Sequence, residues 1–343
     1  MMKNGGGGGG GGVASPIVVL SVVFAASIAI VFVLGYFSDR ANGFGSFYSG
    51  SEAELKIPRV ELVTAAARVT RKWKEDLRFM YIKKEPPIVH DGPCKDIYTS
   101  EGRFIHEMEH GNNKFRTSNA QAAHVYFMPF SVTWMVKYLY KPNTYDLTPL
   151  KVFASDYVKL ISTKHPFWNR THGADHFMLS CHDWGDAFLY NTSIRVLCNA
   201  NSSEGFNPQK DVSLPEIHLY GGIVNPKLIS PPPSNTSRPY LAFFAGGIHG
   251  SIRPILLKHW KGTDSDLHIY EYLPKDQDYY DSMLRSKFCL CPSGYEVASP
   301  RIVEAIYAEC IPVILSDHYV LPFSDVLRWD VFSIQVDISE IPR

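Results

Sequence analysis

The sequence is poor in cysteine and has no net charge. Six cysteines in 343 residues are too few for a small disulfide-stabilised scaffold, and no two have the C-x-x-C spacing of a zinc site. Lys and Arg number 34, as do Asp and Glu, so the formal net charge is zero. Without a basic block, the chain is not expected to bind nucleic acid. The hydrophobic fraction of 45% and the length suit two globular domains.

One long apolar run lies near the N-terminus. It covers 13–37, contains no charged residue and follows a run of glycines at 5–12. A helix of about 20 apolar residues spans a bilayer, whereas the apolar core of a cleaved signal peptide has about 7–15. We therefore expect a cytoplasmic tail at 1–12, a transmembrane signal anchor at 13–37 and a stem at 38–78. A cleaved signal and a buried helix are the alternatives.

Four N-glycosylation sequons lie close together near the middle of the chain, beginning at Asn169, Asn191, Asn201 and Asn235. The charges that flank the apolar run do not decide its orientation. The sequons therefore carry the argument, and they predict a single-pass type II protein whose large C-terminal part lies in the secretory lumen. The lumen also allows disulfides to form, although Cys289 and Cys291 alternate on a predicted strand and are poor partners for each other.

Strands and helices alternate along most of the chain, which predicts βαβ units and mainly parallel sheets. Strands are predicted at 79–82, 124–130, 176–180, 194–198, 240–244, 267–270, 287–291, 312–315 and 332–336. Helices are predicted at 52–78, 132–140, 150–163, 252–258, 278–285 and 299–309. A proline-rich segment at 230–239 reads as a linker. The expected fold class is α/β, with Rossmann-like domains at 79–229 and 240–343 facing a cleft.

A glycine-rich loop follows the predicted strand at 240–244. Gly246, Gly247 and Gly250 would let backbone amides approach an anion, and the next helix would present its N-terminus to the same anion. Arg253 would add a fork-shaped phosphate donor, and His249 would contact donor phosphate. The alternative is an ordinary strand-to-helix turn in which glycine only permits positive φ.

A second loop offers a more complete nucleotide site. Ser293 and Gly294 follow a strand, and Ser299 is predicted to cap the next helix. On that helix, Arg301 and Glu304 are three residues apart and share a face. Arginine would bind phosphate and glutamate would accept both ribose hydroxyls of a nucleotide sugar. The alternative is a surface ion pair.

Several blocks together resemble the exostosin domain of glycosyltransferase family 47, in its plant form. The blocks are Asp91–Tyr98, Glu101–Glu107, Ala123–Phe127, Gly173–Phe177, Phe243–Gly247, Ser299–Ala305 and Ile311–Ser316. The resemblance spans nearly everything from Phe79 onward.

This resemblance implies a GT-B fold with the donor held mainly by the C-terminal domain through Arg301 and Glu304. It implies an inverting Golgi glycosyltransferase that moves a sugar from a nucleotide sugar, expected to be UDP-linked, to a cell-wall polysaccharide or a glycoprotein glycan. A complex with other glycosyltransferases is a further expectation. Family members usually continue beyond the position of residue 343, so the C-terminal domain is expected to be incomplete. An inactive scaffold that binds glycan or a partner transferase is therefore the alternative.

Inversion requires a base for the acceptor hydroxyl. The candidates are Asp175, His176, His182 and Asp183, with Trp184 as a sugar platform. Asp175 as a turn residue and His176 as a core histidine are the competing interpretations. A hydrolase using His182 and Asp183 is disfavoured, because the sequence lacks a G-x-S-x-G nucleophile motif.

Two D-x-D pairs, at 264–266 and 276–278, raise the question of a metal. In other transferases such a pair holds Mn²⁺ against a diphosphate. Here the first is predicted to lie in a polar turn and the second to cap a helix. No metal or other cofactor is expected to be required, and activity should persist in EDTA.

Overall fold

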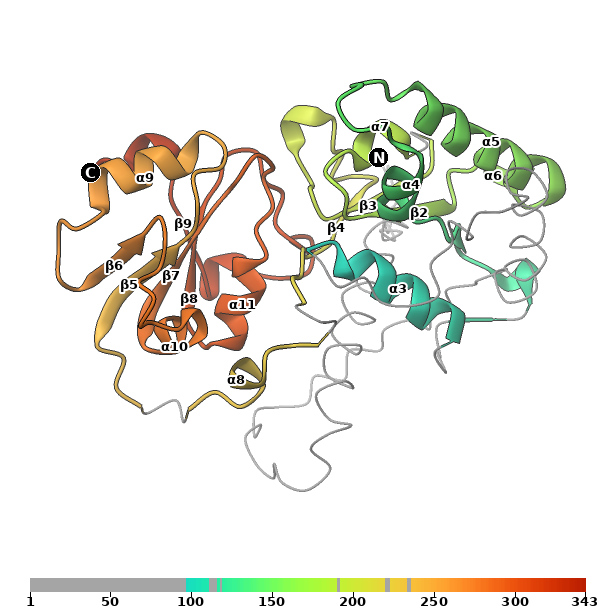
Figure 1. Cartoon of the computed structure of the whole chain (residues 1–343). Helices are drawn as coiled ribbons and strands as arrows, with labels where there is room; N and C mark the ends of the chain where they lie inside the picture. Colours follow the sequence, from blue (N-terminus) through green and yellow to red (C-terminus); the bar gives the residue numbers. More distant parts are fainter. Residues whose placement is uncertain (1–96, 111–115, 118, 190–191, 220–222, 233–235) are drawn as a thin grey trace, which may run out of the picture.

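A computed structural model describes residues 97–343, except 111–115, 118, 190–191, 220–222 and 233–235. The predicted tail, anchor and stem, the first predicted strand and Cys94 lie outside the described residues. Figure 1 shows two lobes, each built around its own sheet, with the segment that carries α8 passing between them. None of the described helices combines the length and the apolarity needed to cross a bilayer.

The N-terminal lobe contains a four-stranded parallel sheet in the order β1-β2-β3-β4. Its strands are β1 (Tyr126–Phe127), β2 (His176–Ser180), β3 (Ile194–Leu197) and β4 (Val212–Ser213). Its helices are α3 (Thr99–His110), α4 (Val132–Leu139), α5 (Thr148–Lys164), α6 (Trp168–Thr171) and α7 (Gly185–Phe188), with 3₁₀ turns η1 (Ala120–Ala122) and η2 (Ser202–Glu204).

Alternation along the strands gives this sheet two buried faces. Phe177 and Leu179 of β2 pack in a core with Ile105 of α3. Met178, between them, packs on the other face with Phe153 of α5. Because successive strand residues point to opposite faces, an unbroken apolar strand requires helices on both sides.

The C-terminal lobe contains a five-stranded parallel sheet in the order β6-β5-β7-β8-β9. Its strands are β5 (Tyr240–Ala245), β6 (Leu267–Tyr270), β7 (Ser286–Pro292), β8 (Ile311–Leu315) and β9 (Ile334–Gln335). Its helices are α8 (Pro226–Ile229), α9 (Ile252–Trp260), α10 (Tyr279–Leu284) and α11 (Arg301–Tyr307), with 3₁₀ turns η4 (Trp329–Val331) and η5 (Ile338–Glu340).

Helices also cover both faces of this second sheet. Phe243 of β5 and Ile302 of α11 share one core with Met283 of α10. Phe244, the next residue along β5, packs on the opposite face with Leu256 of α9. The fold is therefore mixed α/β with two parallel sheets, as the sequence predicts.

The predicted elements from 132 onward agree with the structure in type, and most of them differ from it at one or both ends. The strand predicted at 124–130 is only Tyr126–Phe127, because Pro129 has no N–H to donate and Ser131 already caps α4. The helix predicted at 299–309 is Arg301–Tyr307. Pro300 occupies its N-cap and no side chain caps it, so the prediction that Ser299 is the cap is wrong.

Each lobe contains a disulfide. Cys181 pairs with Cys198, and Cys289 pairs with Cys310. Cys291 is a buried free thiol. The prediction that Cys289 and Cys291 do not pair with each other is confirmed.

The chain enters the C-terminal lobe before it reaches the proline-rich segment at 230–239. Leu228 of α8 already packs in a core of the C-terminal lobe, so this core reaches across the predicted boundary at 229. Backbone hydrogen bonds also link the lobes directly, from Val320 N–H to Ala200 O (2.9 Å) and from Phe323 N–H to Ser213 O (3.1 Å). These bonds bring the ends of β3 and β4 against the segment that follows β8.

Candidate functional site

The two sheets meet where their strands end. Asn199, just after β3, accepts a hydrogen bond at Oδ1 from the N–H of Ala298, which follows β7 (3.2 Å). In open parallel sheets, ligands bind beyond the carboxyl ends of the strands. The junction of the lobes is therefore the place to search for a site.

The β5–α9 loop brings two glycines into close contact with other loops. Gly250 has φ +68°, and a Cβ there would lie 1.8 Å from the carbonyl oxygen of Gly294. A Cβ on Gly246 would lie 2.5 Å from an Nη atom of Arg301. Gly247 meets only ordinary contacts with His249. Positive φ explains Gly250, whereas Gly246 is required because it leaves room for a guanidinium group.

Arg253, on the first turn of α9, turns back toward the same loop. It is 9% exposed, and its Nη1 donates to the carbonyl oxygen of Gly247 (3.2 Å). Gly294 leaves room for Nη2 of the same guanidinium group, since a Cβ on Gly294 would lie 3.2 Å from that atom. Burial, followed by the nearby charge of Arg301, lowers the pKa of Arg253 to about 10.

Arg301 begins α11 and lies across the end of β5. Its Nη2 donates to the carbonyl oxygen of Ala245 (3.1 Å), and its guanidinium carbon lies 5.1 Å from the ring centroid of Phe244. In the described part of the chain, neither Arg301 nor Arg253 forms a salt bridge with a carboxylate. The alternative of a surface Arg301–Glu304 ion pair is therefore wrong.

These two guanidinium groups form an incomplete hydrogen-bonding set. The Nε atoms of Arg253 and Arg301 are both buried and have no hydrogen-bond partner among the described residues. A buried donor without a partner is costly, as are two like charges held close together without a nearby anion. A diphosphate would satisfy both the unpaired donors and the charge, so the residues present fit a nucleoside diphosphate.

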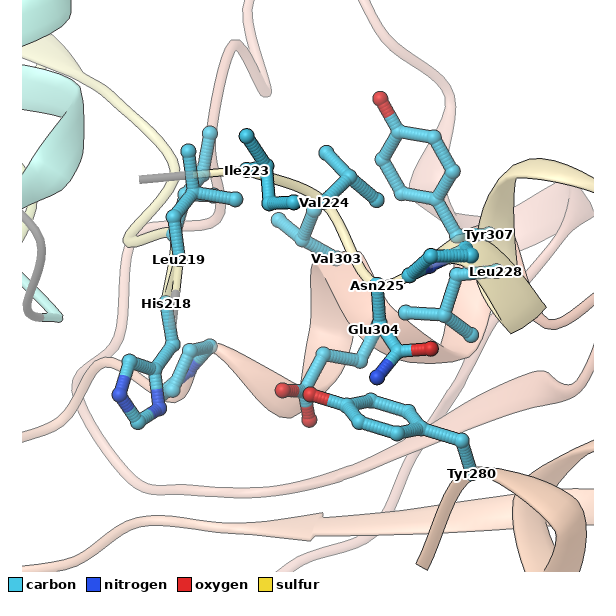
Figure 2. A pocket seen from close by; sticks show the side chains of 13 residues that line it. His218, Leu219, Ile223, Val224, Asn225, Leu228, Tyr280, Val303, Glu304 and Tyr307 are labelled. Carbon is cyan, nitrogen blue, oxygen red and sulfur yellow. The ribbon is translucent and has the colours of Figure 1, made fainter. Parts of the chain in front are cut away.

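Glu304, one turn along α11, lines a cavity of about 240 Å³. The carboxyl group is 8% exposed and accepts a hydrogen bond from the Tyr279 hydroxyl (3.0 Å). Burial raises its pKa, against the opposing charge of Arg301. Tyr280 and Asn225 also line this cavity, and Figure 2 shows the Glu304 carboxyl group beside the Tyr280 ring. The cavity has room for the nucleoside part of a nucleotide sugar.

The remaining predicted residues of this lobe shape the loop or its rim. Ser293 is buried, and its hydroxyl contacts the Val297 carbonyl oxygen (2.8 Å) and Ser316 Oγ (2.6 Å). Ser299 is buried with a hydroxyl that has no partner in the described residues. His249 is exposed, and its ring lies 5.5 Å from the ring of Tyr295 at an interplanar angle of 58°; Tyr295 is itself exposed at the mouth of the site.

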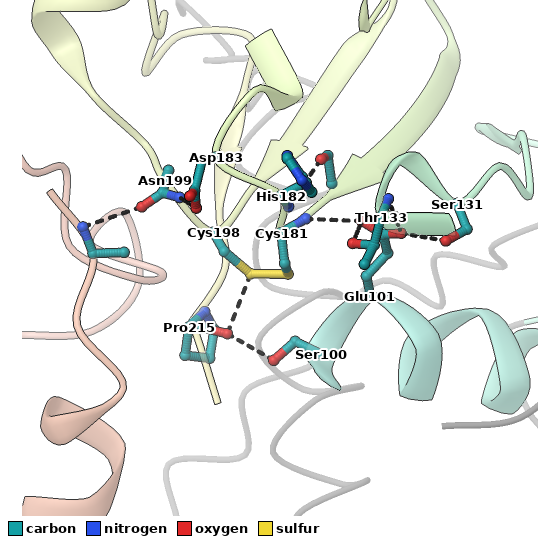
Figure 3. The surroundings of a disulfide bond; sticks show 12 residues. Ser100, Glu101, Ser131, Thr133, Cys181, His182, Asp183, Cys198, Asn199 and Pro215 are labelled. Atoms are coloured by element: carbon teal, nitrogen blue, oxygen red, sulfur yellow. Dashed lines mark hydrogen bonds between the residues drawn. A yellow bond between two sulfur atoms is a disulfide. The ribbon is translucent and has the colours of Figure 1, made fainter. Parts of the chain in front are cut away.

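On the N-terminal lobe, the residues after β2 reach the junction. Asp183 accepts a hydrogen bond from Asn199 Nδ2 (3.3 Å; Figure 3) and also interacts with the Tyr98 side chain. Burial raises its pKa despite these interactions. His182 Nδ1 accepts a hydrogen bond from the Trp184 N–H (3.1 Å), and burial lowers its pKa to about 4. The imidazole is therefore neutral, with its proton on Nε2, where it can only donate.

Asp175 and His176 occupy the opposite end of β2. His176 is 2% exposed, stacks on Tyr126 (4.7 Å) and contacts Asp175 through Nδ1 (2.8 Å). Although burial raises the pKa of Asp175, hydrogen bonds from His176, Thr171 and Arg170 outweigh it and hold the pKa at about 2. The structure therefore brings Asp183 and His182 to the junction and leaves Asp175 and His176 away from it.

Comparison with known proteins fits this geometry. Residues 63–343, more than half of the chain, match the model of the Exostosin GT47 domain. The chain belongs to the exostosin GT47 family.

Several relatives of this exostosin-domain protein come from plants. A probable glycosyltransferase of Arabidopsis thaliana is 62% identical over 298 residues, which are 84% of this chain and 62% of the relative. A probable glucuronosyltransferase of Oryza sativa subsp. japonica is 31% identical (66% of this chain, 56% of the relative). A probable β-1,4-xylosyltransferase of Arabidopsis thaliana is 30% identical (76% and 65%). The chain thus spans about three fifths of the length of these relatives.

Sequence reasoning missed three groups of this exostosin site. They are Asn199, which bridges the lobes, Glu216, which is buried between them, and the Tyr279–Tyr280 pair beside Glu304. Asn199 and Glu216 stand in no motif, because their importance depends on which strand end meets the other lobe. A tyrosine pair on a short helix carries no signal of its own.

The predicted glycosylation sites differ in accessibility. Asn169 is exposed on α6. Asn201 is 7% exposed, and its Oδ1 accepts hydrogen bonds from the Ser203 N–H (3.0 Å) and hydroxyl (2.7 Å), so glycosylation there stays a prediction. Asn191 and Asn235 lie outside the described residues.

The two D-x-D pairs have local roles, as predicted. Asp264 Oδ1 accepts a hydrogen bond from the Asp266 N–H (2.8 Å) within a turn. Asp278 caps α10 by accepting from the Asp281 N–H (2.9 Å). In the described ranges, no group of three or more His, Cys, Asp or Glu side chains could hold a metal ion.

Proposed function

We propose that this exostosin-domain protein is an inverting glycosyltransferase of GT-B architecture that uses a UDP-sugar. The observation that supports it best is the pair of buried, unpaired Nε atoms on Arg253 and Arg301. They lie at the end of β5, next to a carboxyl group, Glu304, that lines a nucleoside-sized cavity. In this arrangement the two arginines hold the diphosphate and Glu304 accepts the ribose hydroxyls.

The chemistry requires two further contributions. As the glycosidic bond to the diphosphate breaks, negative charge grows on the phosphate oxygens, and two preorganised guanidinium groups stabilise it. The acceptor hydroxyl loses its proton as it attacks from the opposite face of the sugar. We assign that base role to Asp183, because it is the predicted carboxylate that reaches the junction and burial raises its pKa.

Substrates and location form the second part of the proposal. Relatives are described as a probable glucuronosyltransferase and a probable xylosyltransferase, so these two sugars are the first to screen. We propose a cell-wall polysaccharide or a related glycan as acceptor. We also propose a type II Golgi membrane location with the lobes in the lumen, to be tested by protease protection of intact vesicles. Cleavage of the lobes without detergent would contradict it.

Calorimetry on the full chain in mild detergent tests the donor site. We expect micromolar binding of UDP, weaker binding of GDP, and a loss of about tenfold to a hundredfold in Arg301→Gln, the cost of one charge-assisted hydrogen-bonding group. Arg328→Gln is the matched control, because Arg328 is exposed and pairs only with Asp330 (3.0 Å). A folded wild type that binds neither nucleotide would favour an inactive scaffold. Equal binding by both variants would place the donor elsewhere.

A further inference from the structure

Glu216 is a buried glutamate whose carboxyl group receives no hydrogen bond from the described residues. It follows β4, is 5% exposed and lines an apolar cavity of about 330 Å³ between the lobes. The opposite walls come from α11 and from the segment 319–332. Among the described residues, no side chain or backbone group forms a hydrogen bond or a salt bridge with it. A buried carboxylate without such partners favours its uncharged form.

Four charged groups influence Glu216 at the junction, one from its own lobe and three from the C-terminal lobe. Asp183, after β2, and Glu296, in the β7–α11 loop, are carboxyl groups that oppose a further negative charge. Arg301 of α11 and Arg253 of α9 favour the negatively charged form of Glu216. Burial is the largest influence on the pKa of Glu216. Burial and the two carboxyl groups outweigh the two arginines and raise this pKa to about 8. Glu216 therefore carries a proton at neutral pH before any ligand binds.

Two phenols complete its surroundings. Tyr98, beside α3, and Tyr319, after β8, both interact with Glu216, and burial raises the pKa of each far above its ordinary value. Both hydroxyls therefore stay neutral across the range in which Glu216 titrates. Burial holds the proton on Glu216, and the two arginines that the proposed function assigns to the diphosphate are the groups that oppose it.

We propose that Glu216 is the uncharged carboxyl group of the diphosphate site, and that binding of a nucleoside diphosphate fixes a proton on it. The inference rests on the proposed donor site. When phosphate oxygens neutralise Arg253 and Arg301, the two charges that favour ionised Glu216 are lost, and the ligand adds negative charge. An ionised Glu216 would repel the same phosphates. Ligand binding and protonation of Glu216 therefore strengthen each other.

Calorimetric titration with UDP at pH 7 and pH 8, in two buffers with different heats of ionisation, measures the protons taken up. UDP contributes little in this range, because its terminal phosphate titrates near pH 6 and its uracil ring keeps its N–H proton. We expect uptake of about a tenth of a proton at pH 7, rising to about half a proton at pH 8, and about twofold weaker binding at pH 8 than at pH 7.

Glu216→Gln keeps the shape of the neutral acid and removes the titration, so it should show neither proton uptake nor this change in affinity. Glu204→Gln, at an exposed glutamate in η2, should behave as the wild type does. Wild-type binding without uptake, or uptake that persists in Glu216→Gln, would overturn the inference.

Thermal unfolding without ligand tests the uncharged state separately. The folded pKa lies above the unfolded value of about 4.5, so the unfolded chain ionises first. Stability should then fall as the pH rises from about 4.5 to 8 in the wild type, relative to Glu216→Gln. UDP binding without this difference would overturn the inference and leave the proposed function intact. If the stability difference between wild type and Glu216→Gln is present but UDP does not bind, the proposed function is overturned. The part of the inference that concerns the diphosphate then fails as well.

Discussion

The two lobes present their functional residues in different ways. In the C-terminal lobe, the predicted donor residues converge, because Arg301 and Glu304 stand one turn apart on the same helix and Arg253 turns back toward them. In the N-terminal lobe, the four predicted bases separate into two pairs at opposite ends of β2. A strand rises about 3.3 Å per residue, so the four steps of β2 from His176 to Ser180 alone cover roughly 13 Å. Closeness in sequence predicts closeness in space on a helix and not along a strand.

The largest effect should come from the N-terminal lobe's cleft-facing carboxylate. Asp183→Asn keeps the hydrogen-bonding shape and removes the base, so kcat for sugar transfer should fall by about 10² to 10⁴, with UDP affinity nearly unchanged. Transfer kinetics with the donor found by screening provide the measurement.

Asp175→Asn is the matched control at the other end of β2. It should lower thermal stability, because it weakens the network with His176 and Arg170, and leave kcat of the folded enzyme close to that of the wild type. Loss of transfer in Asp175→Asn with unchanged stability would break the comparison between the strand ends.

The next largest effect should be on stability. Gly250→Ala combines positive φ with a Cβ placed 1.8 Å from the Gly294 carbonyl oxygen, so it should cost about 3 kcal/mol or prevent folding. Gly262→Ala has the same kind of backbone (φ +72°) with open space around the new Cβ, and should cost about 1 kcal/mol. Urea unfolding measures both, and equal losses would mean that the two loops separate easily.

A smaller effect should follow at the nucleoside cavity. Glu304→Ala removes the proposed ribose acceptor and the partner of Tyr279, so UDP affinity should fall about tenfold or more in calorimetry. Tyr279→Phe removes only one donor to Glu304 and should change affinity by no more than a few-fold. A larger loss in Tyr279→Phe than in Glu304→Ala would contradict a direct role for the carboxyl group.

The smallest effect should be at Ser299. Its hydroxyl has no partner, so Ser299→Ala should change the free energy of unfolding by less than about 0.5 kcal/mol. Ser131→Ala should cost about 1–2 kcal/mol, because Ser131 Oγ caps α4 at Trp134 N (3.2 Å) and donates to buried Glu101 (2.5 Å; Figure 3). A large loss at Ser299 would show that its hydroxyl has a role at the junction.

Much of the fold was predictable because local patterns determine it. The strands at 176–180 and 267–270 agree with the structure at both ends, since each is a short run rich in apolar residues next to turn residues. Short elements such as β4 and α8 were missed. A two-residue strand or a single helical turn carries too little periodicity, and tertiary contacts decide whether it forms.

The residues of the candidate site likewise include some that the local sequence predicts and others that only tertiary contacts place there. Gly246 was predicted to admit an anion to the backbone, but the structure shows that it makes room for Arg301, a contact between positions 55 residues apart in the chain. Asn199 and Glu216 belong to the site only because the ends of β3 and β4 meet the other lobe. No local pattern encodes such a meeting.

The sequence by itself determined the α/β class, the family and the helix that carries Arg301 and Glu304, because these depend on periodicity and on residues close together in the chain. Tertiary structure decided which end of β2 faces the junction, and it left two arginine Nε atoms without partners. It also buried Glu216 among groups of both charges. The physical reason is that burial and electrostatics depend on distances in space, which are set only when the two sheets pack against each other.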